Sequence, residues 1–205
     1  MKIKELLRKC LPILLKGLLL VSFFYFCILF LSGARFFPSQ AAKGTTEIDN
    51  SSVLLGTEGK FPYKVYVYEN AENYCTVITE FKFPLWRSDC ILWAKNEGDM
   101  VKLVGWCSYG KTDAGKGITV VPVQALDENV AYIEMGLGED RQSKEVKRGE
   151  TVLFSWDKQI PWNDLNAIAY SMDKKALYSL GYEIVNSTIH SDELRWLPYE
   201  EEKQN

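Results

Sequence analysis

Histidine and cysteine, which supply most metal ligands and many catalytic groups, are scarce in this sequence. The chain has one histidine, His190, and five cysteines in 205 residues. Because no two cysteines have the Cys-x-x-Cys spacing and there is no second histidine, the sequence indicates neither a zinc site nor a disulfide-dense miniprotein. We therefore expect no metal and no cofactor.

Proline and glycine are also few, at 7 and 14 residues, which excludes a collagen-like or low-complexity chain. The composition, 47% hydrophobic and 25% charged, is typical of a globular protein. The net charge of −3 and the pI of about 5.4 argue against a protein that binds nucleic acid by neutralising phosphates.

The charges are divided unevenly along the chain. Residues 1–16 carry five cations against Glu5, a net charge of +4, so with −3 overall the remaining residues carry −7. The five cations are Lys2, Lys4, Arg8, Lys9 and Lys16. A basic head on an acidic body is typical of a membrane-targeting segment ahead of a solvated domain.

A long uncharged run follows this basic head. Residues 17–34, GLLLVSFFYFCILFLSGA, are 18 residues without a charge. As a helix they would measure about 27 Å, close to the thickness of the hydrocarbon core. We expect residues 11–34 to cross the lipid bilayer as an uncleaved signal-anchor. Because cations stay in the cytoplasm, the sequence predicts a single-pass protein of the cell membrane with a cytoplasmic N-terminus and an extracytoplasmic C-terminal domain.

A cleaved signal peptide is the alternative interpretation of this segment. Ser32 with Ala34, and Ser39 with Ala41, supply the small residues that precede a cleavage site. Cleavage after either alanine would leave a secreted protein.

The rest of the chain divides by composition. Residues 1–34 form the basic head and the helix, and residues 35–59, rich in small polar residues, are predicted to be a flexible tether. Residues 60–199 are the predicted extracytoplasmic domain, and residues 200–205 are an acidic tail.

Residues 60–199 have the pattern of β-strands. Residues 64–68 are almost entirely β-branched or aromatic, and residues 74–83 alternate with a period of two. Turn residues separate such segments at roughly 8–12-residue spacing. The sequence therefore predicts an all-β domain, a β-sandwich or open barrel of about 8–10 short antiparallel strands. The other predicted strands are 90–95, 101–109, 118–125, 131–135, 151–156, 167–171, 176–183 and 194–197.

A catalytic centre would have to use His190. Ser187, Ser191 and Asp192 lie close to it in the sequence, but catalytic triads are defined in space and no Gly-x-Ser-x-Gly motif is present. We expect a protein that is not an enzyme, with a hydrolase centred on His190 as one alternative.

All six tryptophans lie in the predicted exported part. Trp93, Trp106 and Trp156 fall in apolar strand patterns and are predicted to be core residues. The other three have polar neighbours in or near predicted loops, a combination that suits stacking on sugars. The resulting candidate ligand-binding residues are Trp86, Arg87, Trp162, Asn163, Asp164, Arg195 and Trp196.

One disulfide is a candidate. If Gly98-Asp99 forms a two-residue hairpin turn, Cys90 lies directly opposite Cys107, within disulfide reach, which leaves Cys75 free. A turn at Glu97-Gly98 instead would separate the two cysteines by two residues. Three buried thiols without a bridge are an equally good interpretation.

The function predicted from these features is a membrane-anchored β domain that serves as a binding or envelope-assembly module. Its partner would be another envelope protein, and its ligand is not specified by the sequence. The alternatives are a module that binds cell-wall glycan through the loop tryptophans and the hydrolase centred on His190.

Overall fold

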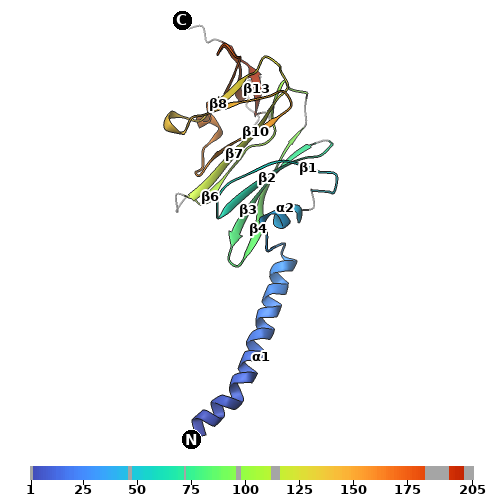
Figure 1. Ribbon diagram of the computed structural model, residues 1–205, viewed down its shortest axis with the longest axis vertical. Coiled ribbons are helices and arrows are strands. Elements are labelled where there is room, and N and C mark those ends of the chain that lie inside the picture. The colour runs from blue at the N-terminus through green and yellow to red at the C-terminus, as the bar shows by residue number, and fades with distance from the viewer. Residues whose placement is uncertain are drawn as a thin grey trace.

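A long N-terminal helix is followed by three antiparallel sheets in the computed structural model (Figure 1). The structure describes residues 2–45, 48–71, 73–95, 98–111, 116–182 and 194–200. The predicted all-β domain behind an N-terminal helix is confirmed. The described residues form thirteen strands, more than the 8–10 predicted, and they make three sheets where a sandwich has two.

Helix α1, Lys2–Leu31, stands clear of the β domain (Figure 1). Its segment Leu11–Leu31 is 21 residues long and is apolar enough to cross a membrane by length and composition. At 1.5 Å per residue this segment measures about 32 Å, against about 30 Å for a hydrocarbon core. Only 6% of its most apolar part is buried within the protein, whereas the core helix of a soluble protein would be mostly buried.

The predicted flexible tether, residues 35–59, is wrong for about half of its length. It contains helix α2, Pro38–Lys43, and strand β1, Val53–Glu58. Ala42 of α2 packs against Tyr66 and Tyr68 of the neighbouring sheet. The sequence pattern did not predict α2 because this helix has only six residues, of which only the two small alanines, Ala41 and Ala42, are buried. Strand β1 lies at an edge, where even Val53 stays exposed.

The first sheet is a meander of consecutive strands. After β1 come β2, Tyr63–Glu69, β3, Asn73–Lys82, and β4, Leu85–Lys95, in the order β1-β2-β3-β4. One face of the sheet carries the cluster with α2, and the other face packs on the second sheet. Strand β3 is therefore buried on both faces along most of its length.

The second sheet shows why one predicted strand is interrupted. Its strands are β5, Val101–Leu103, β6, Cys107–Lys111, β7, Lys116–Ala125, and β10, Thr151–Trp156. Strands β5 and β6 pair with successive parts of β7, so the predicted strand 101–109 is broken at residues 104–106. On the side of β7 that faces β5 and β6, the gap in the ladder falls at Val121 and Pro122, and Pro122 has no N–H to donate there. On its other side Pro122 pairs with Leu153 of β10.

The third sheet is the farthest from α1 (Figure 1). Its order is β13-β12-β11-β8-β9. The bounds are β8 Tyr132–Met135, β9 Gln142–Glu145, β11 Ile168–Tyr170, β12 Ala176–Tyr182 and β13 Leu194–Pro198. Two short 3-10 helices, η2 at Gly138–Asp140 and η3 at Trp162–Asp164, lie in its connections.

Strand β7 joins the two halves of the core. Ile118 and Val120 pack with Tyr63 of the first sheet, whereas Val121 packs in the cluster that includes Ile133 of the third sheet. Because successive side chains of a strand point to opposite faces, β7 can contribute to both clusters. The second sheet is thus the middle layer, and the domain is a stack of three sheets.

The strand pairing that placed Cys90 opposite Cys107 is wrong. Strand β4 pairs with β3, where Cys90 lies opposite Ile78, and Cys107 of β6 lies opposite Val120. The error has a simple cause: β4 is the last strand of the first sheet, and the next strand, β5, belongs to the second sheet instead of pairing with β4. The disulfide candidate therefore loses the register on which it depended.

Candidate functional site

The most distinctive part of the molecule is the junction between α1 and the first sheet. The backbone N–H of Arg35 donates to the carbonyl of Trp86, and the N–H of Trp86 donates to the carbonyl of Arg35, both at 2.8 Å. Leu29 of α1 and Leu85 of β4 are buried in one small cluster beside this pair. The helix therefore continues into the sheet through direct contacts.

The side chain of Arg35 also caps the C-terminal end of α1. Its Nη1 donates to the carbonyls of Phe30 and Ala34, at 2.9 Å each. The last carbonyls of a helix have no partner within the helix, and a basic side chain at this end satisfies them and offsets the negative end of the helix dipole. The guanidinium additionally lies 5.8 Å from the ring centre of Phe30.

Beside the junction lies an aromatic cluster of four residues, Phe61, Phe81, Phe83 and Trp86. Ring centres are 5.2 Å apart for Phe61 and Phe81, 5.5 Å for Phe81 and Trp86, and 6.5 Å for Phe81 and Phe83. These are tilted or edge-to-face contacts, as aromatic pairs prefer. Phe61 and Phe83 are nevertheless 73% and 87% exposed, so the cluster presents apolar rings to its surroundings.

A polar cluster of Glu80, Lys82, Asp89 and Tyr109 adjoins the aromatic cluster. The Tyr109 hydroxyl has one proton to donate and two acceptors within reach, Glu80 Oε2 at 3.1 Å and Asp89 Oδ2 at 3.0 Å. Lys82 Nζ forms ion pairs with Asp89 and, at 3.2 Å, with Glu80. Asp89 takes part because it is the extra residue of a β-bulge: Ile78 pairs with Cys90 and Thr79 with Ser88.

These contacts change the ionisation of the polar cluster. Burial alone would raise the pKa of Asp89, but the hydrogen bonds that it accepts from Lys82 and Tyr109 and the charge of Lys82 favour the carboxylate, and the pKa is lowered. Burial and the hydrogen bond to Asp89 raise the pKa of Tyr109. Lys82 has a raised pKa, chiefly through its bond to Asp89. The contacts of Asp89 with Tyr109 and Lys82 connect β4 with β6 and β3.

The predicted ligand-binding tryptophans do not come together. Trp196 is 4% exposed and lies in the main core, while Trp162 is half-buried in η3 and meets Tyr182 edge-to-face at 4.5 Å. Trp86 belongs to the aromatic cluster at the other end of the domain. A common face of three tryptophans is therefore absent from the described structure.

The polar partners of these tryptophans are equally scattered. Arg87 lies opposite Glu80 in the first sheet, and Arg195 opposite Gly181 in the third. Asn163 is exposed and Asp164 half-buried, both in η3. His190 with Ser187, Ser191 and Asp192 lies outside the described residues. Among the residues described, no three His, Cys, Asp or Glu side chains gather as metal ligands.

The sequence interpretation missed the exposed phenylalanines, although a signal for them exists. The dipeptide Phe-Pro occurs at Phe37-Pro38, Phe61-Pro62 and Phe83-Pro84. Proline disfavours continuation of a helix or ladder, so the phenylalanine before it falls at a turn or an element boundary. All three of these phenylalanines are exposed.

Comparison with known proteins adds no further information about this site, because no family model, no curated protein and no solved structure matches the chain.

Proposed function

We propose that this chain is a single-pass membrane protein whose helix α1 holds the β domain outside the cytoplasm, as a non-catalytic binding or assembly module. The observation that carries the proposal is the combination of an exposed apolar helix with a direct junction to the first sheet. Leu18 of the helix is 67% exposed, whereas Leu29, near its end, is buried against Leu85. A bilayer is the environment that would cover the exposed part.

The charges around α1 support the orientation. Lys2, Lys4, Arg8 and Lys9 precede the apolar segment Leu11–Leu31, and Lys16 lies in its first part, ahead of the uncharged run of residues 17–34. Cations flanking a membrane helix are retained in the cytoplasm. The stack of three sheets would then extend away from the membrane, with the third sheet farthest out (Figure 1). We propose that this distal surface, which includes the exposed Leu137 and Met172, meets the partner protein.

The packing of residues 34–42 supports an anchor that is not cleaved. Ala34 is completely buried beside Leu29 and Leu85, and Ala41 lies inside α2 at 2% exposure. A cut after Ala34 would remove Leu29 from its cluster, and a cut after Ala41 would divide α2. Either product would leave part of the first sheet without its cover.

Protease treatment of intact cells tests the topology. With a tag at each end, external protease should remove the C-terminal tag and leave the N-terminal tag protected. A protected C-terminal tag would contradict the proposal, and release of the intact domain into the medium would favour the secreted alternative. As a control, replacing Lys2, Lys4, Arg8 and Lys9 with Gln should reduce the fraction that has this orientation.

The module role has its own test. A photo-crosslinking residue at Leu137 or Met172, in native membranes, should give a discrete adduct with another envelope protein. The same residue at Ile28, on the apolar face of α1, is the matched control and should give lipid adducts. If both distal positions give no protein adduct, the distal surface is not the partner site.

A further inference from the structure

Exposed phenylalanine rings surround the point where α1 enters the domain. Phe36 and Phe37 follow the helix, Phe61 lies in the turn between β1 and β2, and Phe83 in the turn between β3 and β4. Their exposed fractions range from 58% to 87%. Large apolar side chains scattered singly are ordinary on protein surfaces, but a group of them marks an interaction surface.

These rings are connected to one another through packed neighbours. Phe36 meets Phe30 of the helix at 5.1 Å between ring centres, and Phe61 meets Trp86 at 6.3 Å. Trp86 is in turn paired through its backbone with Arg35. The junction therefore joins the helix-end phenylalanines to the aromatic cluster, and we call the four exposed residues, Phe36, Phe37, Phe61 and Phe83, the aromatic collar.

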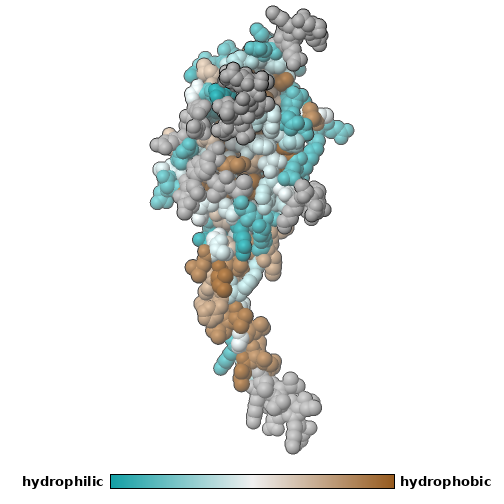
Figure 2. Space-filling model, turned by 180° about the vertical axis from the view of Figure 1, so that it is seen from behind, coloured by the Kyte–Doolittle hydropathy of each residue, from teal (hydrophilic) through white to brown (hydrophobic). Residues whose placement is uncertain are grey.

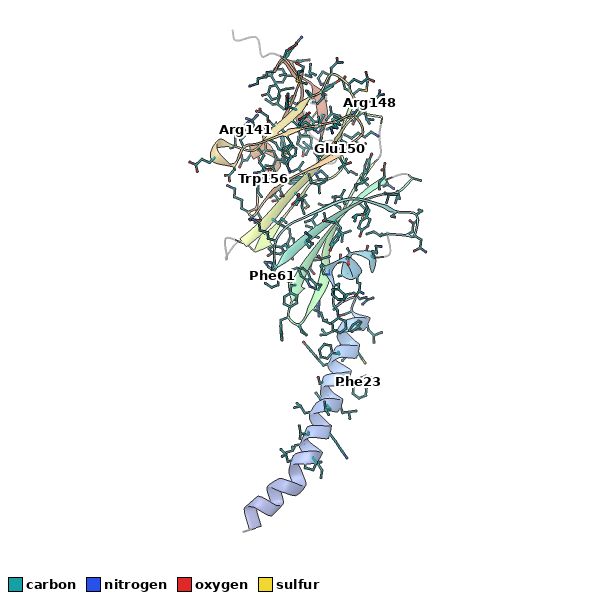
Figure 3. The ribbon with its side chains drawn as sticks, viewed as in Figure 1. Phe23, Phe61, Arg141, Arg148, Glu150 and Trp156 are labelled. Carbon is teal, nitrogen blue, oxygen red and sulfur yellow. The ribbon has the colours of Figure 1, made fainter. Side chains whose placement is uncertain are left out.

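The collar lies at the level at which the helix ends. Leu85, two residues after Phe83, packs on Leu29, and the β3–β4 turn reaches down to the last turn of α1 (Figure 1). Figure 3 places Phe61 at the edge of the domain nearest to the helix, whereas Trp156 lies within the sheets. The apolar surface of the helix continues up to the base of the domain (Figure 2).

Cations accompany the rings. Arg35 is at the helix end, and Lys60 and Lys82 immediately precede Phe61 and Phe83 in the sequence. Lys60 is largely exposed, with 81% of its side chain accessible, and pairs with the exposed Asp157, whereas Lys82 pairs with Glu80 and Asp89. Aromatic rings with adjacent basic groups suit the boundary between acyl chains and headgroups, where rings are buried and ammonium or guanidinium groups reach lipid phosphates.

We propose that the aromatic collar docks on the outer leaflet of the membrane, with Phe61 and Phe83 inserted at the boundary between acyl chains and headgroups. This inference rests on the proposed anchor role of α1 and adds a second attachment to it. The ligand is a lipid surface, because the collar continues the apolar surface of a helix whose length matches a bilayer. Two attachments, the helix and the collar, would fix the tilt of the domain and keep the third sheet pointing away from the membrane.

Tryptophan fluorescence in liposomes tests the insertion. The full chain is reconstituted in phosphatidylcholine–phosphatidylglycerol vesicles with and without brominated acyl chains, which quench only rings close to them. Emission from Phe83→Trp and Phe61→Trp is compared with that of the unchanged chain. We expect the added emission of both variants to be blue-shifted and largely lost in brominated vesicles.

Two further variants make the outcomes distinct. Met172→Trp, at an exposed position near the third sheet, should keep its added emission. Tyr25→Trp, within the segment Leu11–Leu31 of α1, should lose it. If Tyr25→Trp is quenched while Phe83→Trp and Phe61→Trp behave like Met172→Trp, docking is wrong and the anchor stands. If Tyr25→Trp is not quenched, the anchor and the docking are both wrong. If the added emission of Phe61→Trp and Phe83→Trp is blue-shifted but not quenched, the rings are covered by something other than lipid. That result would assign the collar to a protein partner and overturn the lipid assignment.

Discussion

Arg35 and Trp86 exchange two backbone hydrogen bonds of 2.8 Å and so form a bridge between the end of α1 and the start of β4. A helix tethered through a flexible linker would have no such contact. The bridge and the Leu29–Leu85 cluster beside it couple the helix to the domain. The stability of the domain should therefore depend on residues at the end of α1.

Leu29→Ala tests this coupling. Leu29 is 7% exposed in its cluster, so the truncation should lower the free energy of unfolding of the domain by about 2 kcal/mol, the lower end for a buried leucine because the cluster is small. Ile28→Ala, next to it but 63% exposed, is the matched control and should have little effect. Urea unfolding of the full chain in detergent micelles measures both, and equal effects would argue against the coupling.

Thr119→Val should destabilise the domain through a lost polar contact. The Thr119 hydroxyl, completely buried, donates to the carbonyl of Lys158 and accepts from the N–H of Ile160, both at 2.8 Å. Valine has nearly the same shape but leaves these buried groups without that partner, at a cost of about 1–3 kcal/mol. Thr57→Val on the exposed side of β1 should change the urea midpoint little.

Asp89→Asn should make the protein less sensitive to acid. Because the folded pKa of Asp89 lies below its ordinary value of 3.8, its ionised form stabilises the fold above that pH, and this contribution is lost as the pH falls through the folded pKa. The urea midpoint of the unchanged protein should therefore decline more steeply below pH 4 than that of the variant. An identical decline in both proteins would show that Asp89 does not carry the effect.

The control for this pH dependence is Asp157→Asn. Asp157 also forms an ion pair, with Lys60 at 2.8 Å, but both side chains are mostly exposed. Exposed ion pairs contribute little because solvent screens them. This variant should keep the steep decline of the unchanged protein.

Trp196→Ala should destabilise the domain more than Trp162→Ala, although the sequence pattern predicts both as candidate ligand-binding residues. Trp196 is buried in the main core, so its truncation should cost about 3–5 kcal/mol. Trp162 is half-buried and packs mainly on the edge of that core and on Tyr182, so its truncation should cost less. Urea unfolding with tryptophan emission compares the two, and a larger loss for Trp162→Ala would contradict this assignment.

Local patterns were sufficient for most single strands. The alternation at residues 74–83 corresponds to β3, and the β-branched run at 64–68 corresponds to β2. In a strand with a buried face, apolar side chains recur at every second residue whichever strands it pairs with, so the pattern is local. The patterns failed where an element is short or lies at an edge. Helix α2 and strand β1 have too few buried residues to produce a period, and β9, with polar residues throughout, was missed for the same reason.

The candidate site could be predicted in part. The three Phe-Pro dipeptides, which can be found in the sequence directly, mark turns or element boundaries with an exposed aromatic ring. Their proximity to one another and to the end of α1 is not contained in the sequence, since it depends on which turns point toward the helix. The polar cluster is similar: Glu80, Lys82 and Asp89 are close in the sequence, but Tyr109 arrives from another sheet.

The sequence by itself determined the apolar helix and the all-β character of the domain, because both follow from the interaction of each segment with its immediate surroundings. Tertiary structure alone decided which strands pair. It thereby decided that Trp196 is buried and which residue lies opposite Cys90. Trp196 has the same polar neighbours in the sequence whether it faces solvent or the core, and it is buried because β13 joins the third sheet over that core. Cys90 lies opposite Ile78 and not Cys107 because the chain passes to a new sheet after β4, and strand partners are selected by the burial of whole faces, which no local pattern encodes.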